Sequence, residues 1–233
     1  MTKPMIIAEI GSVHDGSFGN AIKLIELAKS SGADIVKFQM HIAEEETIRN
    51  APEPPYFKGE PRYEYFERTS FTTDKWIRIK KYCDSIDIEF LCSPFSNKAV
   101  DILEKLNVRK FKIASGEVTN LPLIEHVART KKPILISSGM STWEELDDAI
   151  SLIKSYHKNI CLLQCTSEYP CSYDNVGLNI IKEMKKRYNI PVGFSDHTLT
   201  NYAAFAATIL GVEYIEKHLT FSKLMYGSDA KNS

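Results

Sequence analysis

The sequence predicts a single α/β domain over residues 1–233, most simply a (β/α)8 barrel of the TIM type. Short apolar segments alternate with amphipathic ones along the whole chain, the apolar segments number eight, and 233 residues suit one such barrel. Strands that alternate with helices form parallel sheets with right-handed crossovers. An open doubly wound sheet is the alternative, but no GxGxxG pattern follows the first apolar segment.

The expected strands are short apolar runs that end in polar residues. They are MIIAEIG (5–11), DIVKFQM (34–40), IEFLCSPF (88–95), KFKIASG (110–116), PILISSG (133–139), ICLLQCTS (160–167), PVGFSDH (191–197) and EYIEKHLT (213–220). Between these runs, apolar residues recur at steps of three and four, which is the spacing of one helix face. The expected helices cover residues 20–32, 73–85, 97–106, 121–130, 142–156, 178–188 and 201–211.

Two segments depart from this alternation. Residues 41–72 contain four prolines, and we expect them to form a long excursion over one end of the barrel. Only 13 residues follow the last expected strand, so the eighth outer helix is expected to be missing. Either the chain is a shortened form, or a partner covers this part of the barrel, as a second copy in a homodimer or as another chain.

Composition argues against several classes of partner. The chain has 29 Lys and Arg against 30 Asp and Glu, without a long basic run, which disfavours nucleic acid and anionic membrane surfaces. The apolar run at the N-terminus is too short for a signal peptide or a membrane span. Five cysteines without a CxxC pair fit a reduced compartment. We therefore expect a cytoplasmic protein without a membrane or nucleic-acid partner.

Charged and hydroxyl side chains gather at the expected strand ends, where the active sites of barrel enzymes lie. Lys37 and Lys112 come from different strands and, with nearby serines, can clamp a phosphate or a carboxylate. The serines are Ser115, Ser138 and Ser195. The alternative is structural, with the two lysines paired to Glu9 and Glu117 in salt bridges.

Two histidines end consecutive expected strands. His197 and His218 can meet at one divalent ion and leave its other positions to water and substrate oxygens. Taken alone, such a pair is more often explained by two core histidines with satisfied hydrogen bonds. His14 and His41 follow the first two strands, and a role in the site stays open for both.

Seven motifs resemble those of the sialic acid synthase family. They are AEIGxxHDG (8–16), KFQ (37–39), FKIASGE (111–117), SSGM (137–140), LLQCTSEYP (162–170), GFSDHT (193–198) and IEKHLT (215–220). They occur in the family's order and on every expected strand end except the third. The resemblance implies the N-terminal TIM-type catalytic barrel of that family. Its members condense phosphoenolpyruvate with N-acetylmannosamine or a related amino sugar, which gives a nine-carbon 2-keto acid and phosphate.

The resemblance also implies roles for single residues. The phosphoenolpyruvate-binding positions fall on Lys37, Lys112, Ser115, Ser138 and Ser195. The ligands of a divalent ion, Mn²⁺ or Mg²⁺, fall on His197 and His218. Catalytic roles fall on Glu9, Glu117 and His218, and further substrate contacts fall on Gln39, Ser167, Tyr169 and Asp229.

The chain departs from the family pattern in its sugar-facing motifs. Val13, Met40 and Ala230 replace the usual Asn, Thr and His, which leaves the phosphate and metal positions intact and concerns the choice of sugar. We expect no C-terminal antifreeze-like domain within residues 1–233. Two alternatives stay open: a synthase for another 3-deoxy-2-keto sugar acid, and a non-catalytic barrel that binds a ligand or serves as an assembly subunit.

Overall fold

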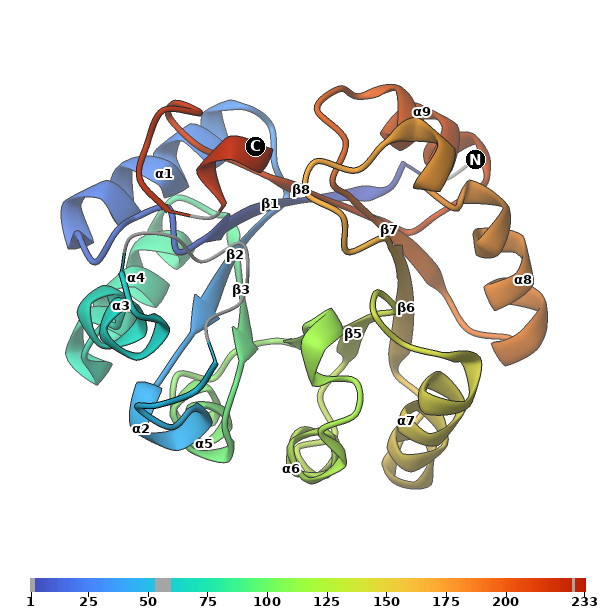
Figure 1. Cartoon of the computed structure of the whole chain (residues 1–233), viewed down its shortest axis with the longest axis horizontal. Helices are drawn as coiled ribbons and strands as arrows, with labels where there is room; N and C mark the ends of the chain where they lie inside the picture. The colour runs from blue at the N-terminus through green and yellow to red at the C-terminus, as the bar shows by residue number, and fades with distance from the viewer. Residues whose placement is uncertain (1–2, 53–59, 228) are drawn as a thin grey trace.

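The computed structural model describes residues 3–52, 60–227 and 229–233, and it confirms the predicted barrel. Eight parallel strands form one sheet in the order β3-β2-β1-β8-β7-β6-β5-β4. The two ends of that order, β3 and β4, lie next to each other, so the sheet is nearly closed (Figure 1). The helices surround the strands on the outside.

Every strand lies within the residue range that the sequence predicts for it. The strands are β1 (Met5–Gly11), β2 (Ile35–Met40), β3 (Glu89–Pro94), β4 (Phe111–Ile113), β5 (Ile134–Ser137), β6 (Ile160–Cys165), β7 (Val192–Asp196) and β8 (Tyr214–His218). Barrel closure places β1 between β2 and β8, so Glu9 lies in register with Lys37 on one side and with His218 on the other.

The seven predicted helices are also present. They are α1 (Phe18–Ser30), α4 (Thr73–Ser85), α5 (Asn97–Lys105), α6 (Leu121–Arg129), α7 (Trp143–Tyr156), α8 (Leu178–Tyr188) and α9 (Tyr202–Ile209). Several begin after a side chain that caps the free backbone N–H groups of the first turn. The clearest case is α7, where the Thr142 hydroxyl accepts from the Glu145 N–H and the Glu145 carboxylate accepts from the Thr142 N–H.

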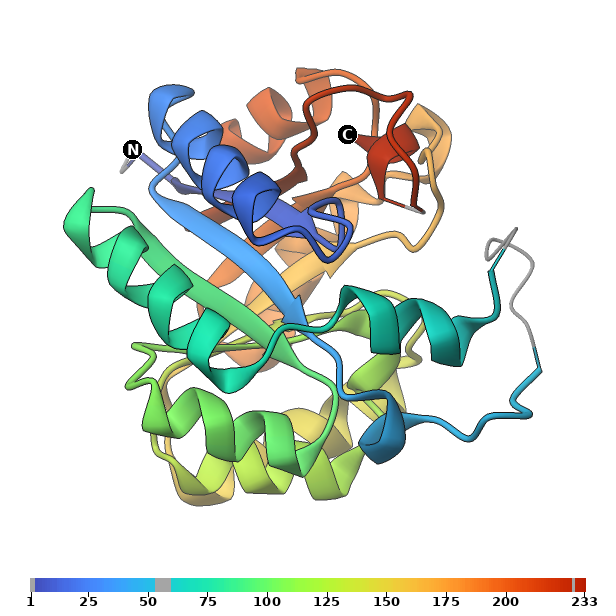
Figure 2. The same ribbon diagram turned by 90° about the vertical axis from the view of Figure 1, so that its left-hand side faces the viewer.

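The predicted excursion contains two helices that the sequence did not indicate. They are α2 (Ala43–Glu46) and α3 (Arg62–Thr69), and residues 53–59 of the excursion lie outside the described residues. Figure 2 shows both helices beyond the carboxyl end of β2, at the same end of the barrel as the arrowheads of the strands. After β8, the described residues form one short 3-10 turn (Ala230–Asn232) and no further α-helix.

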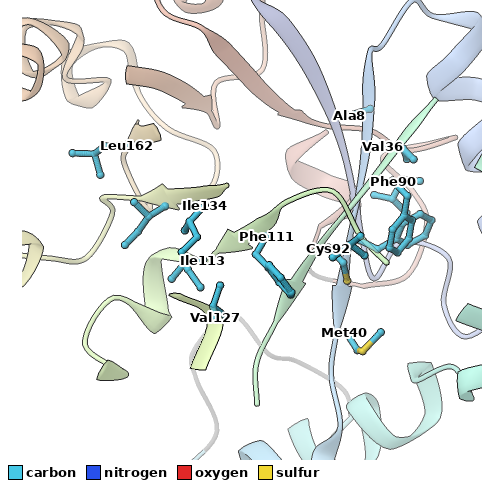
Figure 3. Close-up of a cluster of buried hydrophobic side chains, with 14 of the residues drawn as sticks. Ala8, Val36, Met40, Phe90, Cys92, Phe111, Ile113, Val127, Ile134 and Leu162 are labelled. Atoms are coloured by element: carbon cyan, nitrogen blue, oxygen red, sulfur yellow. The ribbon is translucent and has the colours of Figure 1, made fainter. Parts of the chain in front are cut away.

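The core has two layers because successive side chains of a strand point to opposite faces. The larger layer lies between the outer faces of the strands and the helices, and Figure 3 shows members from β1 to β6, among them Ala8, Phe90 and Ile113. A smaller cluster fills the inside of the barrel with Ile7, Ile35, Leu91, Leu135, Cys161 and Leu163. The next inward position toward the carboxyl end of each of these strands is occupied by Glu9, Lys37, Ser93, Ser137 and Cys165. The apolar cluster therefore forms the floor of the polar end of the barrel.

Two expectations from composition concern the whole chain. All five cysteines are free thiols in the structure, as the absence of a CxxC pair suggested. None of the helices in the described ranges has the length and the apolar character that crossing a bilayer requires.

Candidate active site

A layer of four charged side chains lies directly above the apolar floor of the barrel. Lys37 Nζ is 3.2 Å from Glu9 Oε1 and 3.2 Å from Glu216 Oε1. Lys112 Nζ approaches the other oxygen of Glu216, Oε2, at 3.9 Å. The four side chains come from β1, β2, β4 and β8 and are each at most 6% exposed. Two lysines and two carboxylates thus balance one another inside the barrel.

The charges of this layer shift one another's pKa values. Burial by itself lowers the pKa of Lys37, but the carboxylates of Glu216 and Glu9 outweigh burial and raise it above its usual value. Burial by itself raises the pKa of Glu216, but Lys112 and Lys37 outweigh burial and lower that pKa to about 2. Lys37 and Glu216 are therefore both charged at neutral pH, which explains how a carboxylate is accommodated inside β8.

Glu9 and Lys112 are less completely compensated. Burial raises the pKa of Glu9, and Lys37 opposes only part of that shift. Burial lowers the pKa of Lys112, and Glu216 opposes only part of that shift. In both acidic residues of the layer, Glu9 and Glu216, the oxygen Oε2 is buried without a hydrogen-bond partner among the described residues. Such atoms are costly unless a ligand pairs with them.

The sequence singled out Ser138 for the anion clamp, but the structure also brings in Ser137. Lys112 Nζ donates to Ser137 Oγ at 2.5 Å, while Ser138 Oγ donates to Gln164 Oε1 at 3.4 Å. Ser137 shares the inward face of β5 with Leu135, which lies in the apolar floor. The two-residue period of the strand is the signal that identifies Ser137.

Ser115 and Ser167 meet at Gly139, which follows β5. A Cβ atom at Gly139 would lie 2.7 Å from Ser115 Oγ and closer still to Ser167 Oγ. Ser115 Oγ also donates to the Cys165 thiol at 3.5 Å. A glycine is therefore required for the two hydroxyls to converge, and the predicted positions Ser115 and Ser167 belong to one cluster.

The two predicted histidines lie side by side at the carboxyl ends of β7 and β8. Their ring centroids are 5.5 Å apart, and the Tyr169 ring stacks on His197 at 4.1 Å. His197 Nδ1 donates to the Thr166 carbonyl oxygen at 2.7 Å, which leaves Nε2 with its lone pair. Burial, together with His218, lowers the pKa of His197 to about 4, so the ring is neutral at neutral pH. His218 Nδ1 is buried without a hydrogen-bond partner among the described residues.

These two imidazoles suit a divalent ion better than they suit a closed structural metal site. Within residues 3–52, 60–227 and 229–233, no group of three His, Cys, Asp or Glu side chains is arranged to hold a metal. His197 has the orientation that ligating histidines adopt, because Nδ1 is bonded to a carbonyl, while Nε2 lies 3.5 Å from the Ser195 hydroxyl oxygen. Two imidazoles are fewer ligands than a closed structural site has, so an ion held here would need further ligands from outside this pair.

Asp229 and Gln39 lie at the edges of this arrangement. Asp229 Oδ1 is 4.0 Å from His218 Nδ1, and its Oδ2 accepts from the Ser12 N–H at 3.1 Å. Gln39 Nε2 donates to Glu9 Oε1 at 2.8 Å. Both predicted substrate-binding residues are therefore in contact with predicted catalytic residues or close to them.

Glu117 lies apart from the charged layer. It ends the 3-10 turn Ser115–Glu117 and accepts from Asn120 Nδ2 at 2.8 Å, and burial raises its pKa. The sequence left open that Lys37 pairs with Glu9 in a salt bridge, and the structure contains this pair. In the described structure Glu216, and not Glu117, is the acidic partner of Lys112.

Two of the departures from the family pattern lie in the core. Val13 and Met40 are each 1% exposed and belong to the layer between strands and helices. His14 is 2% exposed and stacks on Phe71 at 4.4 Å, and its Nδ1 accepts from the Gly16 N–H. These three side chains therefore support the loop after β1 and the end of β2 and do not line the charged layer.

Comparison with known proteins shows the family of the chain. The model of the NeuB family matches residues 24–233. The chain belongs to the NeuB family. Among curated NeuB-type relatives, the N,N'-diacetyllegionaminic acid synthase of Campylobacter jejuni is 36% identical over 241 residues, which cover 100% of this chain and 72% of that protein. The N-acetylneuraminate-9-phosphate synthase of Homo sapiens is 36% identical over 229 residues, which cover 96% of this chain and 64% of that protein. The chain thus spans about two thirds of the length of these relatives.

A solved structure supports the same family assignment. The N-acetylneuraminic acid (sialic acid) synthetase from Leptospira borgpetersenii, crystallised in complex with citrate, superposes with a TM-score of 0.88 at 28% identity. The superposition covers 99% of this chain and 78% of that one. The NeuB fold therefore extends over essentially the whole chain.

Proposed function

We propose that this NeuB-family barrel condenses phosphoenolpyruvate with N-acetylmannosamine or a related amino sugar, giving a nonulosonic acid and phosphate. The proposal rests on one observation. Two buried lysines, Lys37 and Lys112, both pair with Glu216, next to the histidine pair at the carboxyl end of the barrel. Family relatives named as legionaminic and N-acetylneuraminate-9-phosphate synthases support the same reaction class.

Phosphoenolpyruvate is held by Lys37, Lys112 and the serine hydroxyls in this proposal. Both lysines are buried, and in the described part of the chain their ion pairs are with carboxylates of the same layer. Lys112 Nζ is 3.9 Å from Glu216 Oε2, longer than a hydrogen bond, so its ammonium group can pair with a substrate anion. Ser115, Ser138 and Ser195 supply neutral donors for the phosphate and carboxylate oxygens.

His197 and His218 are the residues that hold Mn²⁺ or Mg²⁺ in this proposal. A bound divalent ion supplies Lewis-acid polarisation of the aldehyde carbonyl of the open-chain sugar. The protein's own contribution is to keep His197 neutral and oriented through the Thr166 carbonyl. Asp229 lies beside His218 and completes the polar border of that region.

The bond changes follow from these positions. C3 of phosphoenolpyruvate attacks C1 of the sugar, and positive charge develops at C2. Water adds at C2, and the tetrahedral intermediate expels phosphate with cleavage of the C–O bond. Glu9, whose Oε2 has no partner among the described residues, orients the water or stabilises the cation at C2. Holding the two reactants in line supplies up to about 7–11 kcal/mol of the barrier reduction.

The sugar is contacted by side chains above the charged layer. Gln39, Ser167 and Tyr169 take this role in the proposal, beside Glu9, Gly139 and His197 respectively, and Glu117 takes it from the turn after β4. A homodimer or a partner chain, and a cytoplasmic location, stay predictions.

Phosphate release from phosphoenolpyruvate tests the proposal directly. The assay contains Mn²⁺ and one sugar at a time: N-acetylmannosamine, its 6-phosphate, or a 2,4-diacetamido-trideoxyhexose. We expect release with only one sugar of the panel and none without sugar. Release with a different class of aldose, such as a non-acetylated sugar phosphate, would instead identify a synthase for another 3-deoxy-2-keto acid. Binding of phosphoenolpyruvate without release with any sugar would indicate a non-catalytic barrel.

A further inference from the structure

His41, at the end of β2, is held between two aromatic rings from different parts of the chain. Its ring stacks on Phe66 of α3 at 3.9 Å and on Phe95, after β3, at 4.1 Å. The interplanar angles are 7° and 21°, so both contacts are nearly parallel. The Ser70 hydroxyl donates to the His41 carbonyl oxygen at 2.8 Å. The position of this ring is therefore fixed by the excursion on one side and by the barrel on the other.

Both nitrogens of the His41 ring make hydrogen bonds. Nδ1 lies 2.8 Å from Glu46 Oε1 on α2, and Nε2 lies 3.1 Å from Gln39 Oε1. The Glu46 carboxylate is an acceptor. Because Gln39 Nε2 already donates to Glu9, its Oε1 faces His41 as an acceptor as well. Each ring nitrogen thus faces an acceptor oxygen, and close polar contacts connect Glu46, His41, Gln39 and Glu9 in that order.

We propose that His41 is a positioning residue that fixes the orientation of the Gln39 amide, and through it the carboxylate of Glu9. A primary amide can rotate by 180° and exchange its oxygen and its nitrogen. Turned in that way, Gln39 would place its oxygen against Glu9 Oε1 and its NH2 group against an N–H at His41 Nε2, and both hydrogen bonds would be lost. The N–H donated by His41 selects the orientation in which Gln39 donates to Glu9. One oxygen of Glu9 is then engaged by Gln39 and Lys37, and Oε2 stays available.

The same histidine connects the excursion to the reaction centre. Glu46 and His41 are both close enough to Glu117 to influence its pKa, in opposite directions. His41 is therefore near Glu117 and is connected to Glu9 through Gln39, the two carboxylates to which the family resemblance gives catalytic roles. In this proposal α2 and α3 of the excursion hold the His41 ring, and the ring in turn orients the Gln39–Glu9 pair. The kinetic consequence rests on the proposed function, while the orientation of Gln39 does not.

Two substitutions by amide side chains separate this orienting role from a packing role. His41→Gln keeps an N–H donor near the position of Nε2, whereas His41→Asn keeps a donor near Nδ1 only. Both lose the aromatic stacking to a similar extent. We expect kcat to fall about 10- to 100-fold in His41→Asn, and to stay within about 3-fold in His41→Gln, with the KM for phosphoenolpyruvate unchanged in both, as for other outer residues that orient a reacting group.

A second readout is independent of turnover. The side-chain amide signals of Gln39 in a ¹H–¹⁵N spectrum are assigned by their loss in Gln39→Leu. We expect these signals to move toward the positions of solvent-exposed amides in His41→Asn and to stay in place in His41→Gln. Equal behaviour of the two variants in both readouts would overturn the proposal. If the unmodified chain releases no phosphate with any sugar, the proposed function fails, and the Gln39 signals alone decide the role of His41.

Discussion

Replacing Lys37 with Met is expected to weaken phosphoenolpyruvate binding strongly and to destabilise the barrel. Lys37 lies between the carboxylates of Glu9 and Glu216, at 3.2 Å from each. Without its charge, two buried acidic groups face each other, and breaking such an arrangement costs about 3–5 kcal/mol of unfolding free energy. Removing one cation of a buried anion clamp also weakens anion binding by about 100-fold or more. Chemical denaturation and calorimetric titration with phosphoenolpyruvate measure the two effects.

Lys110→Met is the matched control for this substitution. Lys110 precedes β4 and also pairs with a carboxylate, Glu89, at 3.1 Å, but both side chains are 12% exposed. Lys110 lies two positions before Lys112, toward the opposite end of the barrel, so its loss is expected to leave phosphoenolpyruvate affinity unchanged. Equal losses of affinity in the two variants would show that general destabilisation, and not the clamp, explains the effect of Lys37→Met.

Replacing His218 with Ala is expected to lower turnover strongly while the fold is kept. His218 Nδ1 is buried without a hydrogen-bond partner among the described residues. Removing the ring therefore breaks no hydrogen bond at this nitrogen. Turnover falls by about 100- to 1,000-fold, the usual effect of losing a group that stabilises developing charge. The Mn²⁺ affinity, measured by the loss of the free-ion signal in electron paramagnetic resonance, falls by about 100-fold or more.

His126→Ala is the control for the histidine pair. His126 lies on α6, pairs with Asp101 at 2.8 Å and is 37% exposed, far from the ends of β7 and β8. It is expected to keep both the Mn²⁺ affinity and the turnover of the unmodified chain. Retention of full Mn²⁺ affinity in His218→Ala would contradict the assignment of His218 as a ligand.

The barrel was predictable because each strand and each outer helix has its own local pattern. The β8 sequence EYIEKHLT illustrates this: Tyr214 and Glu216 share the inner face, and the apolar neighbours mark a strand. The helices α2 and α3 were not predicted, since their residues are held mainly by contacts that only the fold creates. The stacking of Phe66 on His41 is one such contact.

The members of the site could be named from the strand ends, as could the pairs Lys37–Glu9 and His197–His218, but the other pairs could not. Barrel closure places β8 against β1, and the sequence alone does not give the resulting register of Glu9 with His218. For the same reason Glu216 could not be assigned as the shared partner of Lys37 and Lys112. The two-residue period of β5 is enough to predict that Ser137 points into the barrel toward Lys112. The contact of His41 with Gln39 could not be predicted, because it depends on the positions that both side chains take in the fold.

The fate of the bridging oxygen of phosphoenolpyruvate tests the central claim most directly. Phosphoenolpyruvate with ¹⁸O between C2 and phosphorus is incubated with Mn²⁺ and the sugar that supports release, and phosphate and the organic product are analysed by mass spectrometry. Cleavage of the C–O bond predicts ¹⁸O in the phosphate, together with a 2-keto acid that contains the carbons of both substrates. Unlabelled phosphate accompanied by labelled pyruvate would show hydrolysis at phosphorus and would contradict a condensing enzyme.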